Sequence, residues 1–276
     1  MDNKRYYRRV LSIAGSDPSG GAGIQADIKT ISACGCYAAT AITAVVDENT
    51  VGVYDVHTIP EQFVAGQIRS VLDDIGADAI KIGMLHSSRL VLEVKDTLCA
   101  YPEIRNIVLD PVMVATSGDP LLEADAVETL REELIPMARI ITPNIPEAEI
   151  LLGEKILSND ALPDAARRLS DKCRGVSVFL KAGHLVEKKL TDYFYNAETG
   201  ETIAMSSERI ATVNTHGTGC TLSSALASFL ARGENMNNAA CLAKDYITKA
   251  IRSGAGFSIG HGHGPVNHLF DPKPIQ

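Results

Sequence analysis

Short apolar runs alternate with amphipathic segments along most of this chain, and the alternation limits the folds it can adopt. The run at residues 79–83, for example, is followed by a helix-like segment at 87–98. Such alternation predicts βαβ units, in which parallel strands form a central sheet with helices on both faces. We therefore predict a single α/β domain over residues 1–276.

The remaining elements are predicted from the same periodicities. Strands are expected at residues 10–15, 40–46, 79–83, 107–110, 139–142 and 176–181, and helices at 22–33, 60–75, 87–98, 124–134, 146–152, 161–169 and 237–253. Residues 191–195 and 202–206 are expected to pair as a hairpin, and residues 51–59 to add a short strand or flap.

Composition argues against several classes of protein. The net charge of −8 disfavours nucleic acid or an anionic membrane as the main partner. No apolar run approaches the roughly 20 residues of a transmembrane helix, and the charged first residues contain no apolar signal core, so we expect a cytoplasmic protein. The six cysteines lack zinc-ligand spacing, and most are expected to be buried free thiols.

Residues 214–220, with the sequence NTHGTGC, lead directly into a segment with helical apolar spacing. At a helix N-terminus, free N–H groups and the helix dipole favour an anion. The same field is expected to stabilise a thiolate at Cys220. The pattern predicts a phosphate held at Gly217, Thr218 and Gly219 beside a basic thiolate. An ordinary glycine loop with a packed cysteine is the structural alternative, and His216 is expected to shape the loop.

A second glycine loop, at residues 15–23, follows the first predicted strand. Gly21 and Gly23 match a dinucleotide fingerprint, and Glu48 lies at about the distance of a ribose-binding acid. However, residues 16–20 lengthen the turn, which suits a loop wrapped over a ligand. Asp27 could then direct its carboxylate at that ligand, or could only complement the helix dipole.

Oxygen ligands follow two neighbouring predicted strands. Asp110 ends one strand, and Asn144 and Glu147 follow the next. Mg²⁺ prefers one or two carboxylates together with water and phosphate, so the three residues could hold it. A capped helix start is the structural alternative for Asn144 and Glu147. Lys181 ends a third strand and could bind phosphate or simply extend to solvent.

The residues resemble the hydroxymethylpyrimidine/phosphomethylpyrimidine kinases of thiamine biosynthesis, which belong to the vitamin kinase branch of the ribokinase-like superfamily. The signature is in residues 13–27, IAGSDPSGGAGIQAD. The resemblance continues in order through residues 81–85, 109–113, 117–122, 142–147, 181–184, 214–223 and 260–268.

The resemblance implies a three-layer α/β/α sandwich with a mostly parallel sheet. It also implies transfer of phosphate from ATP, with Mg²⁺, first to 4-amino-5-hydroxymethyl-2-methylpyrimidine and then to its monophosphate. Cys220 would be the general base. Lys181 and Asn144 would lie on the ATP side, and Asp110, Asn144 and Glu147 on the metal side.

The same resemblance places Gly15, Asp27, Val46, Glu48 and Met84 around the pyrimidine. The family carries glutamine where this chain has Glu48. A carboxylate can accept from the 4-amino group, but it donates to a ring nitrogen only when protonated. Pyrimidine recognition is therefore the feature in which this chain departs from the family pattern.

Two other activities remain open at this point. A pyridoxal or pyridoxine kinase would use the same fold and cysteine loop. An NAD-dependent oxidoreductase would instead use the fingerprint at Gly21 and Gly23. The resemblance further implies a homodimer, because this family is often dimeric.

Overall fold

The computed structural model describes residues 6–113, 122–123, 125–182 and 189–274. Residues 117–121 and 183–184, which contribute to the family resemblance, lie outside the described residues. None of the helices in the described part is both long and apolar enough to cross a membrane.

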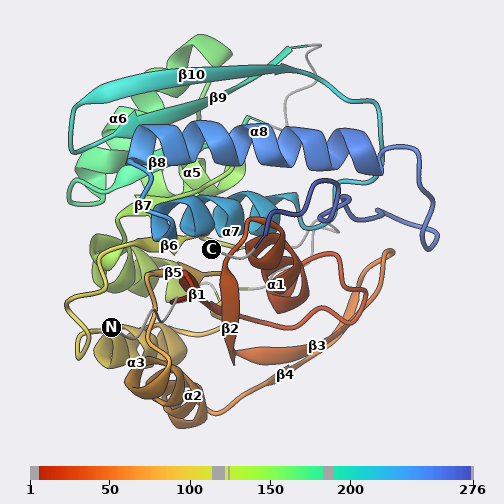
Figure 1. The fold of residues 1–276 in the computed structure, drawn as a ribbon. Coiled ribbons are helices and arrows are strands. Elements are labelled where there is room, and N and C mark those ends of the chain that lie inside the picture. The colour runs from red at the N-terminus through yellow and green to blue at the C-terminus, as the bar shows by residue number, and fades with distance from the viewer. Residues whose placement is uncertain (1–5, 114–121, 124, 183–188, 275–276) are drawn as a thin grey trace, which may run out of the picture.

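The centre of the molecule is an eight-stranded sheet with the order β10-β9-β8-β7-β6-β5-β1-β2 (Figure 1). Strands from β8 to β2 are parallel, and β9 and β10 are antiparallel. The strands are β1 Arg9–Ala14, β2 Tyr37–Ile42, β5 Ala79–Ile82, β6 Ile107–Leu109, β7 Ile140–Ile141, β8 Ser177–Leu180, β9 Lys189–Asn196 and β10 Glu201–Glu208. The predicted parallel sheet and terminal hairpin are confirmed.

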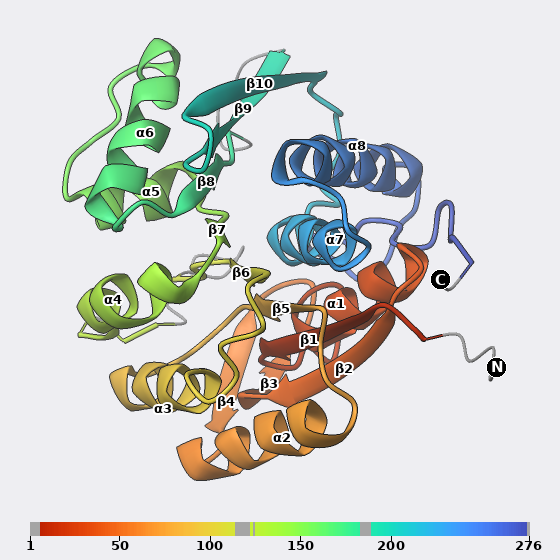
Figure 2. The same ribbon diagram turned by 60° about the vertical axis from the view of Figure 1, so that its left-hand side comes forward.

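Helices cover both faces of the sheet, as the two ribbon views show (Figures 1 and 2). They are α1 Gly23–Ala33, α2 Glu61–Asp74, α3 Ser88–Leu98, α4 Ala126–Thr129, α5 Ile145–Leu152, α6 Leu162–Lys172, α7 Thr218–Ala231 and α8 Met236–Gly254. The helix predicted at 124–134 is shorter, because α4 passes into a π turn at Leu130–Leu134 and a 3-10 turn at Ile135–Met137.

Each face of the sheet has its own apolar core. Leu11 and Ile13 of β1 pack in the core that includes α2, α3, α5 and α6, whereas Val10 packs with α1, α7 and α8. Successive side chains of a strand point to opposite faces, so a strand buried on both faces reads as a continuous apolar run. This arrangement confirms the three-layer α/β/α architecture. The assignment of residues 1–276 to one domain remains a prediction.

The single strand predicted at residues 40–46 is wrong, because the chain divides there into β2 and a separate strand, β3 Ala44–Glu48. The division falls at buried Thr43. Its N–H makes the last bond of the β1–β2 ladder, to the Ala14 carbonyl, and its hydroxyl donates to the Met84 carbonyl. Strand β3 pairs instead with β4 Val53–Thr58 in a two-stranded sheet. The predicted flap is thus confirmed as β4, and Glu48 ends the strand beside it.

Candidate active site

One cavity of about 700 Å³ lies at the carboxyl ends of the parallel strands. Every predicted site residue except Asp27 lines it: Gly15, Val46, Glu48, Met84, Asp110, Asn144, Glu147, Lys181, Gly217, Thr218, Gly219 and Cys220. The sheet therefore brings together side chains from distant parts of the sequence at one rim.

The loop at residues 214–217 delivers the N-terminus of α7 to this cavity. Gly217 is the N-cap residue with φ +73°, and no side chain caps the helix. The Asn214 amide donates to the carbonyls of Gly254 and Phe257, at 2.9 and 2.7 Å, and thereby fixes the loop. Because the first N–H groups of a helix have no intrahelical partner, this end of α7 can bind an anion.

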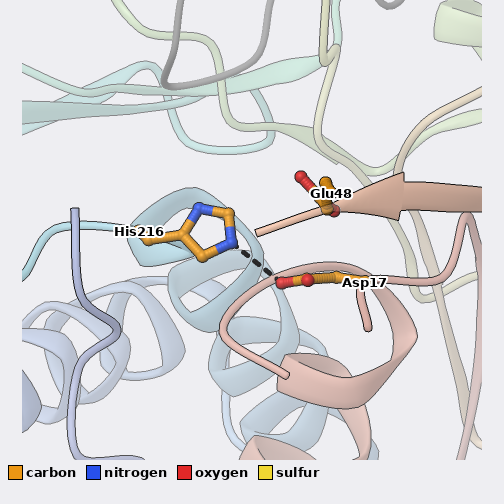
Figure 3. A group of neighbouring side chains, drawn as sticks. All are labelled: Asp17, Glu48 and His216. Carbon is orange, nitrogen blue, oxygen red and sulfur yellow. Dashed lines mark hydrogen bonds and ion pairs between the residues drawn. The ribbon is translucent and has the colours of Figure 1, made fainter. Parts of the chain in front are cut away.

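The N-terminal glycine loop is folded around the carboxylate of Asp17. Ser19 donates its N–H to Oδ1, while Gly21 and Ala22 donate theirs to Oδ2 at 2.9 and 2.6 Å. His216 Nε2 lies 2.8 Å from the same Oδ2, so the two glycine loops are joined directly (Figure 3). His216 therefore shapes the loops, as predicted.

Glu48 faces this pair from the end of β3 (Figure 3). Burial would raise the pKa of Asp17, but hydrogen bonds from His216, Ser19 and Ala22 outweigh it and hold that pKa below its usual range. Burial, followed by the charge of Asp17, raises the pKa of Glu48 to about 7. Asp17 is thus the fixed anion of the cluster, and Glu48 is the carboxyl that can carry a proton near neutral pH.

Asp110 and Lys181 form an ion pair on the opposite side of the cavity. Oδ1 of Asp110 accepts hydrogen bonds from Thr142 at 2.8 Å and from Lys181 at 2.9 Å. Oδ2 faces Gly219, where an added Cβ would lie 3.1 Å from it. Lys181 also lies 4.0 Å from Glu147. Burial raises the pKa of Glu147 to about 7, against the opposing charge of Lys181.

Asn144 and Glu147 form a capping box at the start of α5. The Glu147 N–H donates to the Asn144 side-chain oxygen at 2.9 Å, and the Asn144 N–H donates to Glu147 Oε2 at 2.8 Å. The capped helix start, which is the structural alternative for Asn144 and Glu147, is therefore present. The side-chain oxygen of Asn144 accepts the Glu147 N–H and so helps to hold that residue in position, while its place among the metal ligands remains a prediction.

Cys220 is a partly exposed residue in the first turn of α7, but its thiol is buried. Burial raises its pKa to about 11, although the charge of Lys81 and the backbone N–H of Gly23 act in the opposite direction. The expectation that the helix N-terminus alone gives a thiolate near neutral pH is therefore wrong for the free protein. Desolvation of the charged sulfur outweighs the charge of Lys81 and the hydrogen bond from Gly23.

Asp27 does not reach the cavity, which corrects its prediction as a substrate contact. Its side chain is fully buried, and both oxygens are used. Ser224 donates to Oδ1 at 2.7 Å, while Ser12 and Lys81 donate to Oδ2 at 2.6 and 2.8 Å. The position of Asp27 on the first turns of a helix suggested a ligand contact, but the helix turns it towards the sheet instead.

The half of the cavity that lies between α8 and the segment after β10 was not predicted from the sequence. Helix α8 contributes Lys244, Ile247, Thr248 and Ile251, and the segment after β10 contributes Arg209, Ile210, Thr212 and Val213. Lys244 forms an ion pair with Asp192 at 2.8 Å. A signal was present, because Lys244 and Thr248 share one face of a predicted helix with Ile247 and Ile251, at spacings of three and four residues.

The model of the phosphomethylpyrimidine kinase family matches residues 17–267. The chain belongs to this family. It is 43% identical to the hydroxymethylpyrimidine/phosphomethylpyrimidine kinase of Haemophilus influenzae, over 95% of this chain and 96% of that protein. It is 45% identical to the Escherichia coli enzyme of the same name, over 94% of this chain and 97% of that protein.

A longer relative and two solved structures extend the comparison. The chain is 43% identical to a thiamine biosynthesis bifunctional protein of Geobacter sulfurreducens, but spans only 53% of it. A phosphomethylpyrimidine kinase from Clostridium difficile superposes with a TM-score of 0.76 at 42% identity, covering 88% of this chain and 99% of that one. An ADP complex of Bacillus subtilis pyridoxal kinase superposes with a TM-score of 0.85 at 35% identity, covering 96% of this chain and 98% of that one.

These relationships confirm the family resemblance and the predicted class of enzyme, a phosphotransferase that uses ATP. They also confirm the ribokinase-like fold. The oxidoreductase alternative has no support among them, because the glycine fingerprint lies inside the kinase family match.

Gly217→Ala tests how closely the two glycine loops are packed. At φ +73°, an added Cβ would lie 1.8 Å from the Gly21 carbonyl oxygen, so backbone strain and overlap add. We expect the free energy of unfolding, measured in urea, to fall by about 2–5 kcal/mol. Gly233→Ala is the control: φ is +90° and the Cβ would meet no described atom within 4 Å, so a loss of about 1 kcal/mol is expected. Equal losses would contradict the close packing.

Proposed function

We propose that this protein transfers phosphate from ATP to the hydroxymethyl group of 4-amino-5-hydroxymethyl-2-methylpyrimidine, and then to the resulting monophosphate. The observation that carries the proposal is that the uncapped start of α7, with Cys220 in its first turn, shares one cavity with Asp110, Lys181 and Glu147. Phosphoryl transfer depends mainly on positioning and on stabilising charge, and this arrangement provides both.

Cys220 is the proposed general base. The backbone N–H groups of Gly219 and Cys220 bind the transferring phosphoryl group, and the Cys220 thiolate takes the proton of the substrate hydroxyl. Gly217 and Thr218 shape this end of the helix. The raised pKa of the thiol means that nearby positive charge must favour the thiolate before transfer can occur.

Mg²⁺ fits the side of the cavity around Asp110. The second oxygen of Asp110 faces the start of α7, and Glu147 is held next to Lys181 by the capping box with Asn144. Asp110 and Glu147 would hold the ion through water and phosphate oxygens, the sparse set that Mg²⁺ prefers. The ion offsets the charge of the triphosphate, and Lys181 binds the phosphates directly.

The two substrates occupy opposite halves of the cavity in this proposal. Gly15, Val46 and Met84 enclose the pyrimidine, with Glu48 at its edge. The nucleotide lies between α8 and the segment after β10, where Lys244 and Thr248 provide polar groups among apolar ones. A neutral Glu48 carboxyl can both accept from the amino group and donate to the ring nitrogen, as the family glutamine does.

Pyridoxal kinase is the second candidate, because a solved pyridoxal kinase shares the fold over nearly its whole length. The two activities differ in one countable product: only the pyrimidine kinase transfers two phosphates to one substrate. Incubation with ATP and each vitamin precursor, followed by mass spectrometry of the products, separates them. We further propose a cytoplasmic homodimer, which sedimentation and fractionation would test.

Cys220→Ala is expected to bind both substrates and to lower kcat by about 10²–10⁴-fold, the usual contribution of a general base. Calorimetric titration of ATP and the pyrimidine measures binding, and product formation measures kcat. Cys241→Ala, which changes an exposed cysteine, is the matched control. Near-normal turnover by Cys220→Ala would exclude the thiol as the base.

Glu147→Gln is expected to raise the Mg²⁺ concentration for half-maximal turnover by about tenfold, because a carboxylate of the metal side is lost. The capping contact with Asn144 can be kept by the glutamine oxygen. Activity is titrated with MgCl₂ at saturating ATP. An unchanged titration would remove Glu147 from the metal site.

The raised pKa of Glu48 predicts that pyrimidine binding depends on pH. Its pKa of about 7 lies above the usual range, so the carboxyl is protonated below pH 7 and charged above it. Because only the protonated form donates, KM for the pyrimidine should be lowest below pH 7 and should rise about tenfold per pH unit well above it. Glu48→Gln should remove this rise, and KM for ATP should lack it in both proteins. The same rise in Glu48→Gln would contradict the prediction.

A further inference from the structure

A lysine lies fully buried beneath the active site. Lys81 of β5 and Asp27 of α1 both have 0% exposed side chains, and Lys81 Nζ lies 2.8 Å from Asp27 Oδ2. Burying two charges has a large desolvation cost, and such a pair often contributes no net stability compared with apolar side chains of the same volume. A buried ion pair next to a catalytic residue therefore suggests a role in the chemistry.

Two helix starts place this pair directly under Cys220. Ser224 of α7 donates to Asp27 Oδ1 at 2.7 Å, and Cys220 lies one turn earlier on the same face of α7. Gly23 lies one turn before Asp27 on α1, and its backbone N–H favours the charged form of Cys220. The first turns of α1 and α7 thus meet at the thiol, and the second turns meet at the Asp27 carboxylate.

The positive charge of the pair acts on the thiol more strongly than the negative charge. The ammonium of Lys81 lies against Gly83, where an added Cβ would be 2.8 Å from Nζ. Lys81 lowers the pKa of Cys220 more strongly than Asp27 or Asp110 raises it. Asp27 in turn keeps Lys81 charged, since burial alone would lower the pKa of the lysine and the carboxylate raises it above the usual range.

We propose that Lys81, held and kept charged by Asp27, is a positioning residue whose ammonium stabilises the Cys220 thiolate. The proton of the substrate hydroxyl passes to the Cys220 sulfur as the hydroxyl oxygen bonds to phosphorus, and Lys81 keeps its protons throughout. The inference rests on the proposed role of Cys220 as the base. It explains how a buried thiol can serve as that base although desolvation opposes the thiolate.

The double variant Lys81→Met/Asp27→Asn tests the proposal, because it removes both charges and leaves no buried ion unpaired. Asparagine can keep the hydrogen bonds with Ser12 and Ser224. The readout is alkylation of Cys220 by iodoacetamide between pH 6 and 11, in EDTA, with the exposed cysteines changed by Cys99→Ser and Cys241→Ser and the modified peptide quantified by mass spectrometry.

We expect the alkylation rate at pH 8 to fall at least about tenfold, which corresponds to a rise of at least about one unit in the pKa of the thiol. The value of kcat should fall by a similar factor, while KM for both substrates stays within about twofold. An alkylation rate and a kcat equal to those of the parent would overturn the proposal. Because alkylation requires no turnover, this outcome is distinct from a failure of the proposed kinase activity.

Two further variants keep the test decisive. Arg9→Met/Asp78→Asn removes an ion pair at the N-terminal ends of β1 and β5, the ends away from the cavity. Both the alkylation rate and kcat should stay unchanged. A loss equal to that of the first double variant would mean general destabilisation and would overturn the proposal. Asp27→Asn alone removes the carboxylate that keeps Lys81 charged. Its alkylation rate at pH 8 should fall as in the first double variant, and an unchanged rate would contradict the proposed role of Asp27.

Discussion

The bond between Asp17 and His216 joins two loops that lie 199 residues apart, and the rest of the site depends on it. It brings the starts of α1 and α7 together, with no room for a side chain at Gly217. The start of α7 lacks a side-chain cap, so its first N–H groups remain available at the cavity. The anion site is therefore made by the docking of two loops.

Three clusters of charge surround the cavity, and each has a different function in our proposal. Asp110 with Lys181 faces the phosphates, Asp17 with His216 controls the proton on Glu48, and Asp27 with Lys81 lies under Cys220. In each cluster, burial disfavours isolated charge, so the partner determines which group is ionised.

Much of the fold and of the site could be predicted from the sequence, because both depend on local patterns. The run at residues 79–83 and the glycine loop at 214–217 can be recognised without knowing their neighbours. The errors arose where a distant contact decides. The chain leaves β2 at Thr43, whose hydroxyl bonds to the distant Met84 carbonyl, and nothing in its own segment marks that break. Asp27 faces the interior because Lys81 and Ser224 lie there.

The sequence by itself determined the order of strands and helices, the family, and which side chains end the strands at the rim. Only the tertiary structure decided how those side chains are charged. The Cys220 thiol is protonated in the free protein and Glu48 has a pKa of about 7 because each is withdrawn from water and placed near specific charges. Desolvation and distance belong to the packed molecule and cannot be inferred from the spacing of residues along a chain.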